Sequence, residues 1–330
     1  MIPGSKTILL ISPDTFSYSK FIAEELFAQG FKVVHWNSRL SESSIYKVLL
    51  RVIPGVVKKY SEYFYRKRIA KENIENVQYV LVIKGDGLNA NVIKNLQEKY
   101  SNAKFALYLW DSIRNLNGVK KLALHFKFVA TFDPDDAVLM KWRYRPLFAS
   151  LRAAEEAGNN KQCYKYDISF IGTNHSDRLK ILDLIINKYG SKYRIFIYLY
   201  FQRWWILIFK KLTSWSLFFC KDKYLRSQPI DYMDCLDVIQ NSKAILDIEH
   251  PNQRGLTMRT IEVLISGKKL ITTNTSIKSC DLYHPSRVEL IDRKNPFIRS
   301  EFFLQEFLSI DSNVINRYSI SKWFSDIFTI

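Results

Sequence analysis

The sequence predicts an α/β protein made of two domains, each with a parallel sheet. Short apolar runs alternate with segments of helical periodicity through most of the 330 residues, a pattern typical of parallel sheets covered by helices. The alternation stops over the polar residues 151–165 and then restarts. The length also fits two domains, at about 100–200 residues for each.

The first half of the chain contains five apolar runs with the length of buried strands. They span residues 7–11, 31–36, 79–83, 104–110 and 126–131. Segments with helical periodicity lie between most of them, at residues 18–29, 46–71 and 91–100. Gly30 is expected to end the first helix, and Pro54 with Gly55 to interrupt the second. Asp133 precedes a proline and is placed to cap a further helix.

The second half repeats the pattern. Strands are predicted over residues 167–171, 244–248 and 269–273, and helices over 177–189, 255–266 and 319–330. We therefore expect a first domain over 1–150, a linker over 151–165 and a second domain over 166–310. The residues 311–330 are expected to form a C-terminal helix that packs back on the first domain.

The composition limits the classes of partner. A hydrophobic fraction of 47% excludes an intrinsically disordered chain. The net charge of +17 favours anionic partners, such as phosphates, nucleotide-linked substrates, nucleic acid or anionic membranes. The four cysteines form no CxxC pair, which argues against a zinc site or a disulfide framework. No apolar run reaches 18 residues, which argues against a membrane-spanning helix.

The segment 247–274 carries the strongest chemical signal. It has the pattern of a strand, a polar loop, a helix and a second strand. The loop leads to a helix N-terminus, where unpaired backbone N–H groups and the helix dipole favour an anion. Gly255 permits close approach of a phosphate, and Thr257 can cap the helix or donate to an oxygen.

Three charged residues of this segment extend the signal. Arg254 and Arg259 can form forked hydrogen bonds with phosphate. Glu262 lies one turn beyond Arg259 and can accept from the hydroxyls of a ribose. The alternative is an ordinary helix with a threonine cap and a surface ion pair between Arg259 and Glu262.

At this point the sequence resembles a family. The residues 253–262 (QRGLTMRTIE) with 267–274 (GKKLITTN) resemble the donor-binding segment of GT-B glycosyltransferases. The most similar group is the CgeB-like, family-1-like transferases of capsule and lipopolysaccharide biosynthesis. Weaker similarity extends to residues 166–173 with Arg178, and to 83–87, 109–111 and 132–136.

The resemblance implies two Rossmann-like domains facing a cleft, with an acceptor held by the N-terminal domain (1–150) and a nucleotide-sugar held by the C-terminal domain (166–310). It implies a donor site made of Gly172, Thr173, Asn174, Arg178, His250, Gln253, Arg254, Gly255, Leu256, Thr257, Arg259 and Glu262. His175 is expected near the diphosphate as well. No cofactor or metal is expected, because arginines and a helix dipole can neutralise the leaving diphosphate. The acidic residues 133–136 are interpreted as a helix cap.

An inverting transferase needs a general base that deprotonates the acceptor hydroxyl. Asp111 is the first candidate, because it follows a strongly apolar strand. Asp14, which follows the first strand, is the second, and Asp86 is the third. Each of these residues also fits an ordinary turn.

Two stretches, residues 46–68 and 194–226, mix aromatic side chains with Lys and Arg. Such a mixture suits binding at the surface of an anionic bilayer, although ordinary core strands and helices are the alternative. Together these features predict a cytoplasmic, peripheral glycosyltransferase that extends a cell-surface polysaccharide or lipid-linked saccharide. The alternatives are a basic nucleic-acid-binding protein, although no specific nucleic acid is expected, and a catalytically inactive GT-B-like binding subunit.

Overall fold

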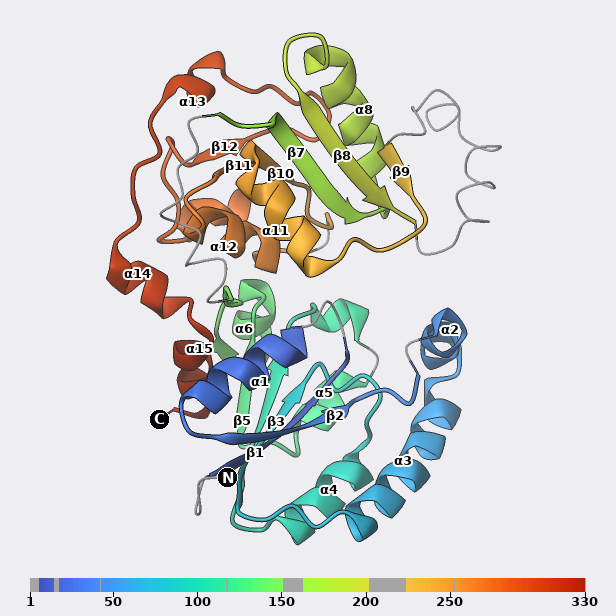
Figure 1. Cartoon of the computed structure of the whole chain (residues 1–330). Helices are drawn as coiled ribbons and strands as arrows, with labels where there is room; N and C mark the ends of the chain where they lie inside the picture. The colour runs from blue at the N-terminus through green and yellow to red at the C-terminus, as the bar shows by residue number, and fades with distance from the viewer. Residues whose placement is uncertain are drawn as a thin grey trace. The chain divides into compact units, whose positions relative to one another are not determined.

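The computed structural model describes residues 6–14, 18–41, 43–116, 118–150, 163–201, 224–251 and 253–329 (Figure 1). The chain forms two compact units. Unit 1 comprises Met1–Leu147 with Tyr318–Ile330, and unit 2 comprises Phe148–Arg317. Most of the predicted linker, residues 151–162, lies outside the described residues, as do residues 202–223 of the second aromatic and basic stretch.

Unit 1 is built on a six-stranded parallel sheet in the order β2-β1-β3-β4-β5-β6. The strands are β1 (Thr7–Ser12), β2 (Lys32–Asn37), β3 (Val77–Ile83), β4 (Lys104–Leu109), β5 (Phe128–Thr131) and β6 (Arg143–Tyr144). The helices are α1 (Tyr18–Ala28), α2 (Ser44–Val52), α3 (Pro54–Lys71), α4 (Ala90–Lys99), α5 (Val119–Ala123), α6 (Pro134–Met140) and α15 (Ile320–Phe328), with a 3-10 turn η1 (Ile113–Asn115).

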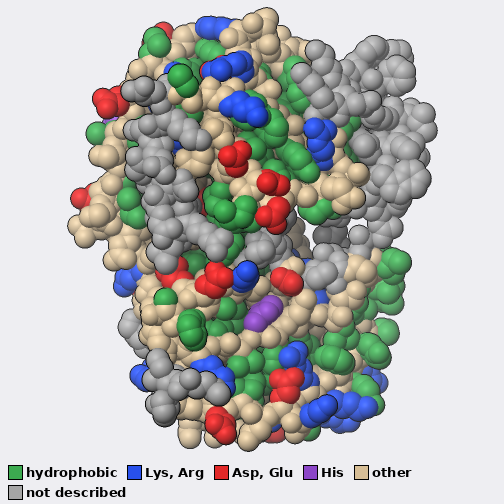
Figure 2. Space-filling view, viewed as in Figure 1, with side chains coloured by type: hydrophobic (Ala, Val, Ile, Leu, Met, Phe, Trp, Pro, Cys, Tyr) green, Lys and Arg blue, Asp and Glu red, His purple; other side chains and the backbone are tan. Residues whose placement is uncertain are grey.

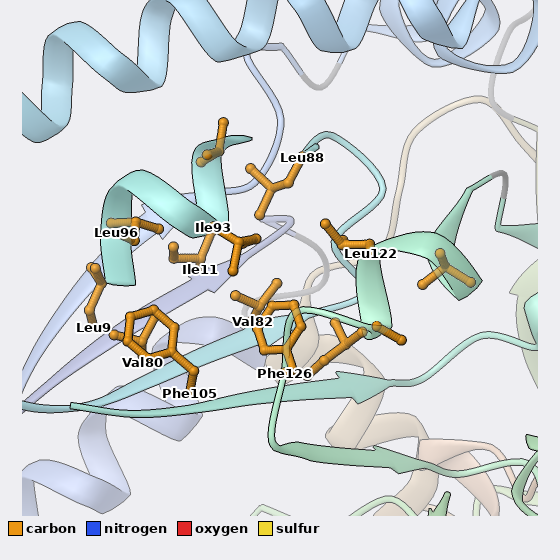
Figure 3. Packing of buried hydrophobic residues seen from close by; sticks show 14 of the residues in the cluster. Leu9, Ile11, Val80, Val82, Leu88, Ile93, Leu96, Phe105, Leu122 and Phe126 are labelled. Carbon is orange, nitrogen blue, oxygen red and sulfur yellow. The ribbon is translucent and has the colours of Figure 1, made fainter. Parts of the chain in front are cut away.

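One face of this sheet carries the main core of unit 1. Leu9 of β1 and Val80 and Val82 of β3 point to the same side, because side chains alternate along a strand. Ile93 and Leu96 of α4 pack on them (Figure 3). These five side chains are each buried to below 1% exposure. The alternation in the sequence therefore matches a sheet that is covered on this face by helices.

The C-terminal helix α15 packs on the sheet of unit 1 beside β4 and β5. The ring of Trp323 lies edge-on to that of Tyr108, with 4.9 Å between the centroids. Phe328 contacts Tyr79 with 5.0 Å between the ring centroids. Because Tyr79 and Tyr108 alternate with the residues that face α4, α15 covers the opposite face of the sheet.

Unit 2 is a second six-stranded parallel sheet, in the order β12-β11-β10-β7-β8-β9. Its strands are β7 (Tyr166–Thr173), β8 (Ile195–Tyr200), β9 (Leu225–Arg226), β10 (Ser242–Asp247), β11 (Lys269–Thr272) and β12 (Val288–Leu290). Its helices are α8 (Arg178–Tyr189), α11 (Tyr232–Gln240), α12 (Met258–Ile265), α13 (Ser300–Leu304) and α14 (Ser312–Arg317), with a 3-10 turn η4 (Thr275–Ser279). The predicted fold class, α/β with two parallel sheets, is confirmed.

Several predicted elements have shifted ends. The helical segment predicted over 46–71 begins at Ser44, and it is interrupted at Pro54 as predicted: the chain turns at Ile53, and α3 starts with Pro54 in its first turn. The helix predicted from residue 255 starts at Met258, since Thr257 is its N-cap. Residues 195–200 of the second aromatic and basic stretch form β8, with Ile197 and Leu199 buried. For these residues the ordinary core alternative is the observed one.

Candidate functional site

The chain order of unit 2 reverses between β7 and β10. From β7 the sheet first extends through β8 to β9, and it then continues on the other side of β7 with β10, β11 and β12. Open parallel sheets bind ligands beyond the carboxyl ends of the strands at such a reversal. The loops that follow β7 and β10 contain most of the donor-binding residues predicted from the sequence. The candidate site is therefore this edge of unit 2.

Two histidines meet at the reversal. His175 follows β7 and His250 follows β10, and 5.4 Å separates their ring centroids. Burial, together with the charge of Arg178, lowers the pKa of His175 to about 4. His175 is therefore neutral at pH 7, where one ring nitrogen donates a hydrogen bond and the other accepts one.

Arg178 joins the two loops. Its Nε donates to the carbonyl oxygen of Ile248 at 2.7 Å, and its Nη1 donates to that of Thr173 at 2.8 Å. Gly172 leaves room for this arrangement, since a Cβ atom there would lie 3.1 Å from Nη1 of Arg178 and 2.9 Å from Cζ of Phe170. Arg178 was predicted to bind the donor. Its side chain instead connects the two loops, through hydrogen bonds to their backbone carbonyl oxygens.

The start of α12 lies beside the end of β10. Thr257 caps the helix by accepting from the backbone N–H of Thr260 at 3.1 Å. The hydroxyls of Thr257 and Thr260 donate to Oδ2 of Asp247 at 2.8 and 2.5 Å. A carboxylate of the protein itself therefore lies at this helix start. Thr257 acts here as a cap, one of the two roles weighed for it.

The loop before α12 holds the other predicted residues of this segment. Arg254 is exposed and Gln253 is half-buried, whereas Gly255 and Leu256 are buried. The side-chain amide of Asn274, which follows β11, donates to the carbonyl oxygens of Arg254 and Gly255 at 3.4 Å each. The end of β11 thus anchors the loop that carries Arg254.

Glu262 is buried in unit 2, with 1% of its surface exposed. Its Oε1 accepts a hydrogen bond from the hydroxyl of Tyr232 at 3.0 Å, and that hydroxyl lies 2.6 Å from Oγ of Ser150. Burial raises the pKa of Glu262, while the Arg259 charge and the Tyr232 hydrogen bond oppose the shift. Nη1 of Arg259 donates to Sγ of Cys235 on α11 at 2.6 Å. The structure therefore places both residues of the predicted pair against α11.

Arg293, which follows β12, was not identified from the sequence. Its guanidinium forms a forked contact with Asp177, at 2.8 and 3.1 Å, and a 2.5 Å bond with Glu249. It also donates to the hydroxyl of Thr273 at 3.0 Å, and Thr273 donates to Glu249. One cation thereby ties together the loops that follow β7, β10 and β11. No spacing rule could have found it, because its partners lie 116 and 44 residues away.

Unit 1 has its own reversal, between β1 and β3. Asp14, the second predicted base, follows β1 and is exposed. After β3 the chain passes through left-handed conformations at Lys84 (φ 68°) and Gly85 (φ 66°). Lysine rarely adopts such a φ, so the surrounding contacts must hold it there.

Those contacts are ion pairs at the carboxyl edge of the sheet. Nζ of Lys84 pairs with Asp111 and lies 3.9 Å from Oδ2 of Asp86. Nε and Nη2 of Arg39 bind the same oxygen of Asp86 at 3.1 and 2.5 Å. The structure thus brings together the first and third predicted bases, Asp111 and Asp86, through Lys84.

The acidic residues 133–136 lie at the start of α6. Oδ1 of Asp133 accepts from the backbone N–H groups of Asp135 and Asp136, so Asp133 is the helix cap. Within the described parts of the chain, no group of three or more His, Cys, Asp or Glu is arranged to hold a metal ion. Among the helices described, none is both long enough and apolar enough to cross a bilayer.

No protein-family model and no curated protein matches this chain. Solved structures do match. An alpha-glucosyltransferase in complex with UDP and a 13-mer DNA has a TM-score of 0.58 at 12% identity, over 98% of this chain and 91% of the other. HepE of Anabaena, in complex with UDP and glucose, has a TM-score of 0.55 at 11% identity, over 98% of each chain. The lipopolysaccharide outer core galactosyltransferase WaaB has a TM-score of 0.51 at 11% identity, over 98% of this chain and 99% of the other.

The chain has a GT-B glycosyltransferase-like fold. The similarity to these structures extends over nearly the whole chain. At such low sequence identity, it supports an inference about the fold alone. The GT-B architecture expected from the sequence is therefore confirmed. Membership of the CgeB-like group stays a prediction.

Proposed function

We propose that the protein is a metal-independent glycosyltransferase of the CgeB-like, family-1-like group. It moves a sugar from a nucleoside-diphosphate sugar to a saccharide or lipid-linked saccharide of a bacterial cell surface. The observation that carries the proposal is the reversal edge of unit 2, where His175, His250 and the loop to α12 meet on a GT-B-like fold. The presence of UDP in the HepE and alpha-glucosyltransferase structures supports a nucleoside diphosphate as the ligand. The WaaB likeness supports a lipopolysaccharide-type product.

The proposed donor contacts divide into two groups. Residues 172–174, His250 and residues 253–256 surround the diphosphate, and Arg254 supplies the exposed cation of the loop. Glu262 accepts a hydrogen bond from a ribose hydroxyl, which replaces the hydrogen bond that Glu262 accepts from the Tyr232 hydroxyl in this structure. Arg178, Thr257 and Arg259 keep these groups in place through the contacts described above.

In unit 1 we propose Asp111 as the base that accepts the proton of the acceptor hydroxyl, should the reaction invert the sugar carbon. Its carboxylate forms an ion pair with Lys84 at the carboxyl edge of the sheet of unit 1. Asp14 is the second candidate.

Calorimetric titration with UDP, GDP and CMP tests the donor site. We expect one nucleoside diphosphate to bind, and Arg254→Ala to weaken that binding by roughly tenfold or more, since a charge-assisted hydrogen bond contributes about 1.5–3 kcal/mol. Asp111→Asn, in the other unit, should bind the nucleotide as the unmodified protein does. The proposal fails if none of the three nucleotides binds, or if Arg254→Ala has no effect. Salt-sensitive binding of a random oligonucleotide without nucleotide binding would favour the nucleic-acid alternative.

The low pKa of His175 gives a pH test of the same site. A diphosphate beside this ring stabilises the imidazolium and so raises its pKa from about 4 toward its ordinary value of about 6.5. Binding then takes up a proton. The affinity contributed by His175 is therefore present at acid pH and is lost as the pH rises through the bound-state pKa.

The measurement compares UDP dissociation constants of the unmodified protein and His175→Asn between pH 7.5 and 5.5. Protonation of the nucleotide itself affects both dissociation constants equally, so its effect cancels in their ratio. It should shift about tenfold in favour of the unmodified protein at the acid end. A ratio that does not change with pH would place His175 away from the diphosphate.

A further inference from the structure

Two consecutive helices of unit 1 expose a continuous set of large apolar side chains. On α2 these are Ile45, Val48, Leu49 and Val52, at the i, i+3, i+4, i+7 spacing that lines one side of a helix. Val52 is 71% exposed. The set lies on a helix surface that faces away from the protein core, where aliphatic side chains of this size seldom cluster.

The set continues along α3. Val56, Tyr60, Tyr63 and Phe64 are exposed and follow the same helical spacing, whereas Val57, Ser61, Tyr65 and Ile69 are buried at every fourth position. The buried residues fasten α3 to the protein, and α2 packs against α3. The exposed stripe therefore belongs to a folded and anchored pair of helices.

Cations border this stripe. Residues 44–71 contain eight Lys or Arg and a single acid, Glu62. Glu62 accepts hydrogen bonds from the side chains of Asn89 and Asn91, at 2.6 and 2.9 Å. The exposed cations of α3 are Lys59, Arg66, Lys67 and Lys71. Figure 2 shows hydrophobic side chains gathered where α2 and the adjoining part of α3 lie, with Lys and Arg side chains next to them.

The position of the cations along α3 matters. By helical geometry Lys59 and Arg66 lie along one side of the apolar stripe, and Lys67 and Lys71 continue it toward the end of the helix. Nζ of Lys67 lies 4.5 Å from the ring centroid of Tyr63. The surface thus has aliphatic groups at its centre, tyrosines beside them and cations at its margin. This order complements the surface of a bilayer, which has apolar chains below a headgroup region with phosphates.

We propose that α2 and α3 form a docking surface for an anionic lipid bilayer, in which the apolar stripe enters the headgroup region and the flanking cations bind lipid phosphates. Both parts of the surface are needed for this assignment. Nucleic acid would use the cations and rings but not the four aliphatic side chains of α2. The inference does not depend on the proposed function, because none of these residues belongs to the proposed donor site or is a proposed base.

Vesicle flotation of the full chain tests the proposal. We expect the protein to float with phosphatidylcholine vesicles that contain phosphatidylglycerol at low salt, and to float much less at high salt or with phosphatidylcholine alone. The triple variant Lys59→Gln, Arg66→Gln, Lys67→Gln should bind about a hundredfold more weakly at low salt, at about 1 kcal/mol for each cation. Its matched control is Lys94→Gln, Lys180→Gln, Lys278→Gln, which removes three exposed cations elsewhere and should float as before.

A second pair of variants tests the apolar stripe. Val52→Ser, Val56→Ser, Tyr60→Ser should lower binding by roughly tenfold or more at both salt concentrations. Leu124→Ser, Val138→Ser, Leu304→Ser removes three aliphatic side chains elsewhere that are even more exposed, and it should have little effect. All four variants change exposed positions, and circular dichroism with thermal unfolding verifies that each one folds.

Three results would overturn the proposal. The first is equal flotation of the α2–α3 variants and their controls. The second is the absence of flotation with anionic vesicles at low salt. The third is a dimer in light scattering that the serine variant dissociates, without lipid binding, which would assign the surface to a second copy of the chain. Nucleotide calorimetry on the same variants separates a failure of this proposal from a failure of the proposed function.

Discussion

Replacement of Arg293 by Met should lower the free energy of unfolding by about 2–3 kcal/mol, which is among the largest effects expected for a single residue here. Removing one member of a buried ion pair costs about 3–5 kcal/mol, because the remaining charges lack a counterion. The Arg293 side chain is 22% exposed, so solvent screens part of this cost. The variant leaves Asp177 and Glu249 facing each other without their shared cation.

Urea unfolding followed by circular dichroism measures this effect. The midpoint should fall with little change in slope. Arg194→Met is the matched control, because Arg194 also binds a carboxylate, Asp167, through a forked contact but lies at the surface. It should shift the midpoint little. Equal midpoints for Arg293→Met and the unmodified protein would mean that the network adds nothing to stability.

The effect of Arg293→Met also depends on pH. Its hydrogen bonds lower the pKa of Asp177 in the folded state. The contribution of Asp177 is therefore complete above its unfolded value of about 3.9 and is lost as the pH falls through the lower folded-state pKa. The difference between variant and unmodified protein should shrink at acid pH. Under the proposed function, the same variant also binds nucleotide more weakly, because three loops of the site share this cation.

Replacement of Gly87 by Ala should destabilise unit 1 by about 3 kcal/mol. A Cβ atom at this position would lie 2.0 Å from the backbone oxygen of Ser38 and 3.1 Å from its carbonyl carbon. Backbone atoms cannot rotate away as the end of a side chain can, so the loop after β3 must move. That movement would separate Asp86 from Arg39 and disturb Lys84 and its partner Asp111.

Gly55→Ala is the control for this variant. Gly55 lies in the first turn of α3, and apart from its chain neighbours and the adjoining helix backbone no atom lies within 4 Å of the position that a Cβ would take. Alanine there should leave stability unchanged or raise it by up to about 1 kcal/mol through helix propensity. The measurement is the urea midpoint of both variants. Similar midpoints for the two alanine variants would show that the loop after β3 accommodates a side chain.

Local patterns in the sequence predicted much of the fold, because the information lies within a few residues. The runs 8–11 and 79–83 are apolar throughout, as is typical of parallel strands that are buried on both faces. Asp133, with a proline after it, became a helix cap, and Pro54 became the first residue of α3. The two-residue strands β6 and β9 were not predicted, since so short a segment shows no period.

The sequence by itself also indicated the loop to α12 as a place where an anion could bind, from Arg254, Gly255 and Thr257 before one helix and Arg259 within it. Only the tertiary structure decided which arginine is exposed, Arg254, and which arginines are engaged by the protein itself. Arg178 binds carbonyl oxygens, Arg259 reaches Cys235, and Arg293 unites three loops. The physical reason is the order of the strands. Parallel pairing sets β7 beside β10, so side chains that are far apart in the chain meet at the same edge of the sheet. The charge interactions at that edge cannot be predicted from the spacing of residues within one segment.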